Sequence, residues 1–128
     1  MIAVDTSIWV AVLRSATSRE ADTLRALIDA DEVVLPVPVR VELLSGASAA
    51  DRKRLRRTLS ALPIVFPTDD TWRLIDTWVE RAGSAGERFG LGDLLIGALS
   101  AEAGALIWSR DAGFARMEAL GLLERYEP

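Results

Sequence analysis

Short apolar runs alternate with longer stretches of helical periodicity, and this alternation restricts the fold more than any other feature of the chain. Four runs are candidates for buried strands: residues 2–4, 33–35, 64–66 and 105–108. Strands buried on both faces read as continuous apolar runs, and parallel strands need helical crossovers between them. The sequence therefore predicts one α/β domain, residues 1–128, with a short, mainly parallel sheet and helices on both faces.

Capping signals and apolar spacing predict where the helices begin and end. Thr6 or Ser7 can cap the first helix, and Thr17 the second, because Thr17-Ser18-Arg19-Glu20 has the form of a capping box. Pro38 suits the first turn of a helix, which puts Glu42 on that helix. The helices of predictable extent cover residues 8–13, 17–31, 49–61, 69–82, 93–103 and 112–120, and residues 122–123 are a possible last strand.

The helix that Asp69 or Asp70 begins has a regular apolar pattern. Trp72, Ile75 and Val79 follow one another at spacings of three and four. We expect them to share one face of that helix.

The chain has neither cysteine nor histidine. Their absence excludes disulfide frameworks, thiolate or imidazole zinc sites, cysteine nucleophiles and every histidine general base. Any chemistry must use carboxylates, hydroxyls, arginines and bound metal.

Four acidic residues lie at the boundaries of apolar segments. Asp5 directly follows the first predicted strand, and Asp111 follows the last after a two-residue step. Glu42 lies inside an apolar stretch, and Asp93 precedes another. Because the carboxyl ends of parallel strands meet at one edge of a sheet, Asp5 and Asp111 should share that edge.

Clustered carboxylates repel one another unless protons or a hard cation share the site, and oxygen-only ligands suit Mg²⁺ or Mn²⁺. Such a site can hydrolyse phosphodiesters without histidine or cysteine. Each acid also has a structural explanation: Asp93 and Asp111 could be helix N-caps, and Glu42 could be a solvated residue on the outside of its helix. Asp5 has the weakest alternative, because Thr6 and Ser7 are available as caps.

The sequence resembles a PIN domain, and in particular a VapC-type toxin of a bacterial toxin–antitoxin pair. The matching segments occur in the family's order and run from residue 2 to residue 117: IAVDTSIWV, PVRVELLSGA, LGDLLIGALSAEAGA and IWSRDAGFARM. One residue departs from the pattern, since many relatives have a threonine where this chain has Ser109. The hydroxyl group is retained.

The resemblance implies a three-layer α/β/α sandwich and a catalytic site made of Asp5, Glu42, Asp93 and Asp111. It further implies that Asp5, Asp93 and Asp111 bind Mg²⁺ or Mn²⁺, and that nearby hydroxyls assist; here these are Thr6 or Ser7, and Ser109. The implied activity is cleavage of single-stranded RNA that leaves a 5′-phosphate. The implied partners are a second copy of the chain and a VapB-like antitoxin that covers the site. The alternative is a non-catalytic relative that keeps the fold and binds RNA or an antitoxin.

Charge is unevenly distributed along the chain. The net charge is −4, yet residues 40–60 contain six basic residues and only two acidic ones. The run from Arg52 to Arg57 is typical of a solvated helix face, and phosphate steering or an acidic partner is the alternative. The apolar N-terminus has no basic flank and contains Asp5, so we expect neither a signal peptide nor a membrane span, and a cytoplasmic protein.

Overall fold

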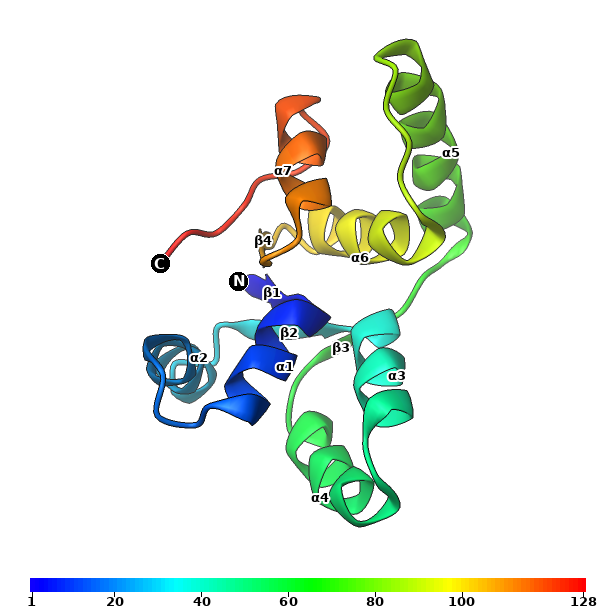
Figure 1. Ribbon diagram of the computed structural model, residues 1–128. Helices are drawn as coiled ribbons and strands as arrows, with labels where there is room; N and C mark the ends of the chain where they lie inside the picture. The colour runs from blue at the N-terminus through cyan, green and yellow to red at the C-terminus, as the bar shows by residue number, and fades with distance from the viewer.

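Four short parallel strands form the centre of the molecule, in the order β3-β2-β1-β4 (Figure 1). The computed structural model describes residues 1–128. The strands are β1 (Ile2–Val4), β2 (Val33–Pro36), β3 (Ile64–Val65) and β4 (Leu106–Trp108). All three pairings are parallel, and β1 lies between β2 and β4. The predicted mainly parallel sheet is therefore confirmed.

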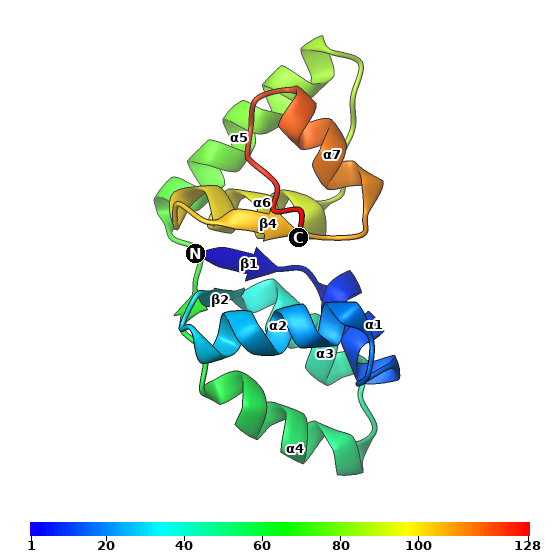
Figure 2. The ribbon, with the colours of Figure 1, turned by 90° about the vertical axis from the view of Figure 1, so that its left-hand side faces the viewer.

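Seven helices surround the sheet and connect its strands. In Figure 1, α2 and α6 lie on opposite sides of the sheet, and α5 packs against α6. In Figure 2, the arrow of β1 points toward α1 and that of β4 toward the start of α7, so both helices begin at the carboxyl end of the sheet. The helices are α1 (Thr6–Arg14), α2 (Arg19–Asp29), α3 (Val37–Gly46), α4 (Ala49–Ser60), α5 (Asp69–Ser84), α6 (Leu91–Glu102) and α7 (Ala112–Ala119).

Two of the predicted helix caps were wrong. Asp5 caps α1 itself by accepting a hydrogen bond from the Ser7 amide, so Thr6 is already the first helical residue. Ser18 caps α2 by accepting from the Ala21 amide. The acidic Glu20 lies one position too early to complete a capping box with Ser18, which is why the Thr17 pattern was misleading.

Of the apolar residues predicted to share one face of α5, only Ile75 is buried. Trp72 and Val79 are nearly half exposed, and the buried residues of the helix are Thr71, Ile75, Trp78 and Ala82. The Thr71 hydroxyl donates to Glu102 Oε1 over 2.5 Å, at the end of α6. This bond orients α5 with Thr71 inward and so turns the adjacent Trp72 toward solvent.

The basic helix α4 buries its leucines, and the C-terminal segment pairs with β4. Leu55 and Leu59 are buried on α4. Arg52 alone of the basic run bonds main-chain oxygens, those of Leu44 and Ala47. Residues 122–123 form no strand. The chain instead meets β4 slightly later, where Ile107 pairs with Arg125 in a single parallel bridge. None of the helices has the length and apolar character needed to cross a membrane.

Gly97 lets α6 approach its neighbours closely. A Cβ atom at this position would lie 3.1 Å from Leu123, 3.2 Å from Met117 and 3.2 Å from the Trp78 ring. Contacts of this length leave no space for a larger side chain in a core packed as densely as a crystal.

We expect Gly97→Val to lower the free energy of unfolding by about 2–3 kcal/mol, because overpacking forces neighbouring side chains out of their rotamers. Urea denaturation would measure the change. Gly92→Val is the matched control on the same helix, since a Cβ there has no neighbour within 4 Å. Equal stability of the two variants would contradict the packing argument.

Candidate active site

Four elements bring the four predicted acids to the carboxyl end of the sheet. Asp5 ends β1 and Asp111 begins α7 after β4, while Glu42 lies on α3 and Asp93 on α6. The charges of Asp5, Glu42 and Asp111 all act on Asp93, so the four carboxylates share one electrostatic environment. Asp5 is buried, Asp93 is half-buried, and Glu42 and Asp111 are exposed.

Asp5 is the most constrained of the four, with 5% of its surface exposed. Its Oδ2 accepts hydrogen bonds from the hydroxyls of Ser7 and Ser109, each over 2.7 Å. The two hydroxyl oxygens lie 3.2 Å apart. All of these bonds use Oδ2, so Oδ1 of Asp5 remains free of protein donors.

The predicted hydroxyls therefore separate into two roles. Ser7 and Ser109 both hold Asp5, one from α1 and the other from the end of β4. Thr6 instead donates to Glu42 Oε1 over 3.1 Å. Glu42 is accessible to solvent, as expected for a solvated residue on the outside of its helix. The bond from Thr6, which follows Asp5 directly, nevertheless turns its carboxylate toward the other acids.

Asp93 and Asp111 meet across a glycine. The Gly113 amide donates to Asp111 Oδ1 over 2.9 Å, so Asp111 caps α7. Asp93 does not cap its helix, because the N-cap of α6 is Gly90. A Cβ atom on Gly113 would lie 3.3 Å from Asp111 Oδ1 and 3.3 Å from Asp93 Oδ2. The missing side chain leaves the space on which these two oxygens converge.

The clustering changes the protonation of two acids. Partial burial raises the pKa of Asp93, and the negative charges of Asp111, Asp5 and Glu42 raise it further, while Arg116 opposes them. Partial burial and the charge of Asp5 raise the pKa of Glu42, although the hydrogen bond from Thr6 lowers it. These acids are therefore less stable as anions than isolated carboxylates would be.

The donor chemistry of the site suits Mg²⁺ or Mn²⁺, which prefer oxygen ligands. In this structure no three acidic side chains are close enough to hold an ion together. The free Oδ1 of Asp5 and the space over Gly113 are the two features that favour an ion among them. The residues thus fit a divalent cation in the type of donor atom that they offer.

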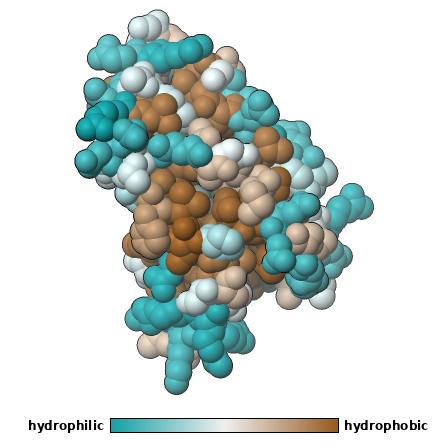
Figure 3. Space-filling model, turned by 180° about the vertical axis from the view of Figure 1, so that it is seen from behind, coloured by the Kyte–Doolittle hydropathy of each residue, from teal (hydrophilic) through white to brown (hydrophobic).

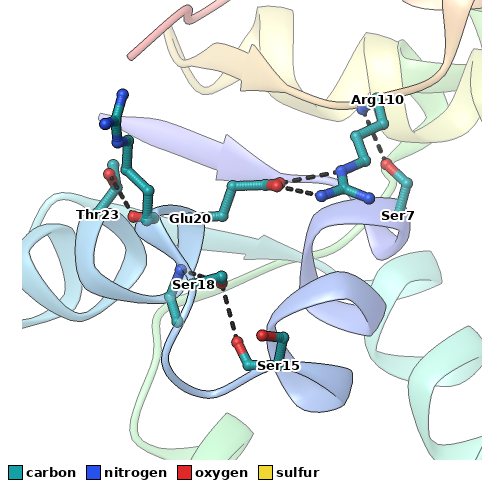
Figure 4. A network of polar contacts seen from close by, with 8 residues as sticks. Ser7, Ser15, Ser18, Glu20, Thr23 and Arg110 are labelled. Carbon is teal, nitrogen blue, oxygen red and sulfur yellow. Dashed lines mark hydrogen bonds and ion pairs between the residues drawn. The ribbon is translucent and has the colours of Figure 1, made fainter.

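Sequence reasoning missed two arginines near the acids. Figure 4 shows Arg110 reaching from the loop after β4 to Glu20 on α2. The Arg110 amide also donates to Ser7 Oγ over 3.0 Å. Arg116 lies on α7, where it forms an ion pair with Glu87 over 2.5 Å. No local signal pairs Arg110 with Glu20, since 90 positions separate them.

Comparison with known proteins identifies similar chains. The PIN domain family model matches residues 2–120. The chain is 34% identical, over 119 residues and 89% of both chains, to a VapC ribonuclease of Mycobacterium bovis and to ribonuclease VapC11 of Mycobacterium tuberculosis.

Solved structures share the fold at lower identity. FitAcB from Neisseria gonorrhoeae has a TM-score of 0.81 at 20% identity and covers 98% of this chain and 97% of its own. VapBC2 from Rickettsia felis, bound to a promoter DNA fragment, has a TM-score of 0.79 at 18% identity, with 98% of both chains covered. VapC20 of Mycobacterium tuberculosis, described as a sarcin–ricin loop cleaving toxin, has a TM-score of 0.69 at 20% identity over 100% of both chains.

Asp93→Asn should stabilise the protein at neutral pH in EDTA. At a pH below the unfolded-state pKa, Asp93 is protonated in both states and the two proteins should be equally stable. As the pH rises through the higher pKa of the folded state, only the wild type loses stability, because its native state holds the proton more tightly than its unfolded state.

Melting curves between pH 3 and pH 8 would measure the difference. We expect a gain of about 2 °C at pH 7, small because solvent screens a partly exposed carboxylate. Asp76→Asn, which alters an exposed residue of α5, is the control and should show no such trend. A gain in stability that is the same at all pH values would refute the raised pKa of Asp93 as its cause.

Proposed function

The chain belongs to the PIN-domain family, and on this premise we propose that it is the toxin of a toxin–antitoxin pair, an endoribonuclease that hydrolyses phosphodiester bonds of single-stranded RNA with Mg²⁺ or Mn²⁺. The observation that carries the proposal is that four separate elements place four carboxylates at the carboxyl end of the sheet, near enough for three of the charges to raise the pKa of Asp93. Acids that served only as helix caps would not need to lie near one another. Their mutual repulsion costs stability, so a purely structural role gives no reason for the cluster.

The acids and the hydroxyls would have different roles in such a reaction. Asp5, Asp93 and Asp111 would hold the ion, with Asp5 oriented by Ser7 and Ser109. A bound Mg²⁺ or Mn²⁺ supplies an activated water and offsets phosphate charge. Glu42, whose pKa is raised by partial burial, can hold or release a proton at its carboxylate while Thr6 fixes its orientation.

The relatives support the RNA substrate and the antitoxin. The two mycobacterial relatives are named ribonucleases, and a structural neighbour from Klebsiella pneumoniae is named a toxin–antitoxin complex. A groove of about 440 Å³ between α1, α3 and α4 is lined by Trp9, Leu13, Leu43 and Leu55, and it opens beside Glu42. A bound antitoxin segment would cover apolar surface there and reach the acids.

Cleavage of RNA would place the toxin in the cytoplasm.

The alternative function is a non-catalytic PIN-fold protein that binds RNA or an antitoxin. It explains the fold and the groove equally well. It does not account for the complete set of four acids or for the two hydroxyls that hold Asp5. A cleavage assay separates the two functions.

Purified protein should cleave single-stranded RNA in Mg²⁺ or Mn²⁺ and lose activity in excess EDTA. Asp93→Asn should reduce the rate about a hundredfold or more, because a carboxylate at the reacting centre is lost. Asp76→Asn should leave the rate unchanged. A pool of total bacterial RNA, read by sequencing of new 5′ ends, avoids assuming a target.

The products should carry a 5′-phosphate and a 3′-hydroxyl, since water attacks and the ribose 2′-hydroxyl takes no part. Ligation that depends on a 5′-phosphate would detect them. Products with a 2′,3′-cyclic phosphate, or undiminished cleavage in EDTA, would exclude this mechanism.

We also expect a homodimer. Figure 3 shows an apolar area across the middle of one face, between the charged ends formed by α5 and α4. Exposed large apolar residues include Phe66, at 62%, and Trp72, at 47%. An apolar surface of this kind is unusual in a monomer and common in a symmetric dimer.

Light scattering at micromolar concentration should give twice the mass of one chain. Trp72→Glu should weaken the dimer about tenfold or more, because it replaces a large exposed apolar side chain with a charged one. Leu13→Glu is the control, since Leu13 lies in the groove between α1, α3 and α4. A wild-type monomer under these conditions would contradict the expectation.

A further inference from the structure

The carboxylate cluster presents an obstacle to any RNA substrate, because it would repel the phosphate backbone. Among the charges that shift the pKa values of Glu42 and Asp93, the only positive one is that of Arg116. A cation in this position would attract phosphate to an otherwise negative surface. Arg116 has no role in the mechanism described above.

The geometry places Arg116 over the convergence point of two acids. It lies on α7, three residues after Gly113, and helical residues at this spacing are neighbours on the surface. Its Nη2 is 3.8 Å from the position that a Gly113 Cβ would occupy, the same point that lies 3.3 Å from Asp93 Oδ2 and Asp111 Oδ1. Arg116 nevertheless forms no ion pair with either aspartate, since its carboxylate partner is Glu87.

The guanidinium of Arg116 is held from two directions. Nη1 donates to Glu87 Oε2 over 2.5 Å, and the central carbon stands 5.1 Å from the centre of the Phe89 ring. Both partners lie in the segment between α5 and α6. This arrangement fixes the guanidinium and leaves Nη2 without a hydrogen-bond acceptor in the protein, while the side chain stays 49% exposed.

We propose that Arg116 binds a phosphate of the RNA at the active site, with Nη2 as the donor. The proposal rests on the proposed ribonuclease function and adds a substrate-binding residue to it. An arginine with one amino group tethered and another free loses little side-chain freedom when it binds phosphate, and its planar guanidinium suits an oxyanion.

Arg110, which directly precedes Asp111, is a second candidate for this role, and its bonding excludes it. Its Nε and Nη2 both bind the Glu20 carboxylate. Its guanidinium would have to leave this paired arrangement before it could bind phosphate. Arg116 needs no such rearrangement.

The test measures binding of a fluorescein-labelled single-stranded RNA of mixed sequence by anisotropy, in EDTA so that no cleavage occurs. Arg116→Gln should weaken binding about tenfold at low salt, the effect of one charge-assisted hydrogen bond. It should also reduce the slope of log affinity against log salt concentration by about 0.7, as expected for one lost phosphate contact to a single strand. Arg116→Lys should keep most of that slope.

Two further variants distinguish phosphate binding from a structural role. Glu87→Gln breaks the same ion pair but keeps the cation, so the salt slope should stay at the wild-type value. Arg73→Gln removes an arginine that also has one tethered amino group, bonded to Asp70 over 2.8 Å, at the far end of α5. It should bind RNA as the wild type does. Melting curves would confirm that each variant is folded.

The outcomes separate this inference from the function on which it rests. If Arg116→Gln binds with the wild-type affinity and slope, or if Glu87→Gln loses as much slope as Arg116→Gln, the phosphate contact is refuted while the ribonuclease function stands. If the wild type neither binds single-stranded RNA in EDTA nor cleaves it in Mg²⁺ or Mn²⁺, the ribonuclease proposal itself fails, and this inference fails with it. A wild type that cleaves RNA in Mg²⁺ or Mn²⁺ but does not bind it in EDTA would refute the phosphate contact alone.

Discussion

A buried carboxylate is stable only when hydrogen bonds compensate for its lost hydration, and Asp5 obtains them by joining two strand ends. Ser7 comes from the helix that follows β1, and Ser109 from the end of β4. The Asp5 amide also donates to the carbonyl of Trp108, so main chain and side chain fix the same junction. The position of Asp111, two residues after Ser109, depends on this junction.

The remaining acids are placed by packing rather than by hydrogen bonds to Asp5. Asp93 lies on α6, which approaches its neighbours through Gly97, and Glu42 lies on α3, which contacts both α1 and α6. The packing energy of the apolar core thus offsets the repulsion among the carboxylates. A site of this kind holds fixed charges in a partly dehydrated space, where they act more strongly than in water.

The sequence predicted features that depend on local pattern or on strand ends. The four strands and the four acids follow from apolar runs and from the geometry of parallel sheets. The rotation of α5 could not be predicted, because it depends on Thr71 reaching Glu102 on another helix. The N-caps of α1 and α2, Asp5 and Ser18, were missed because the hydroxyl residues beside them can cap a helix equally well. The tethers of Arg110 and Arg116 join segments distant in sequence.

The strand order has a consequence for the synthesis of this protein. Its central strand β1 is made before the other three strands and pairs with β4, which is made after them. A nascent chain that still lacks residues 106–111 therefore has neither Ser109 nor Asp111 beside Asp5. An activity that needs these groups therefore begins only after β4 and the start of α7 have left the ribosome.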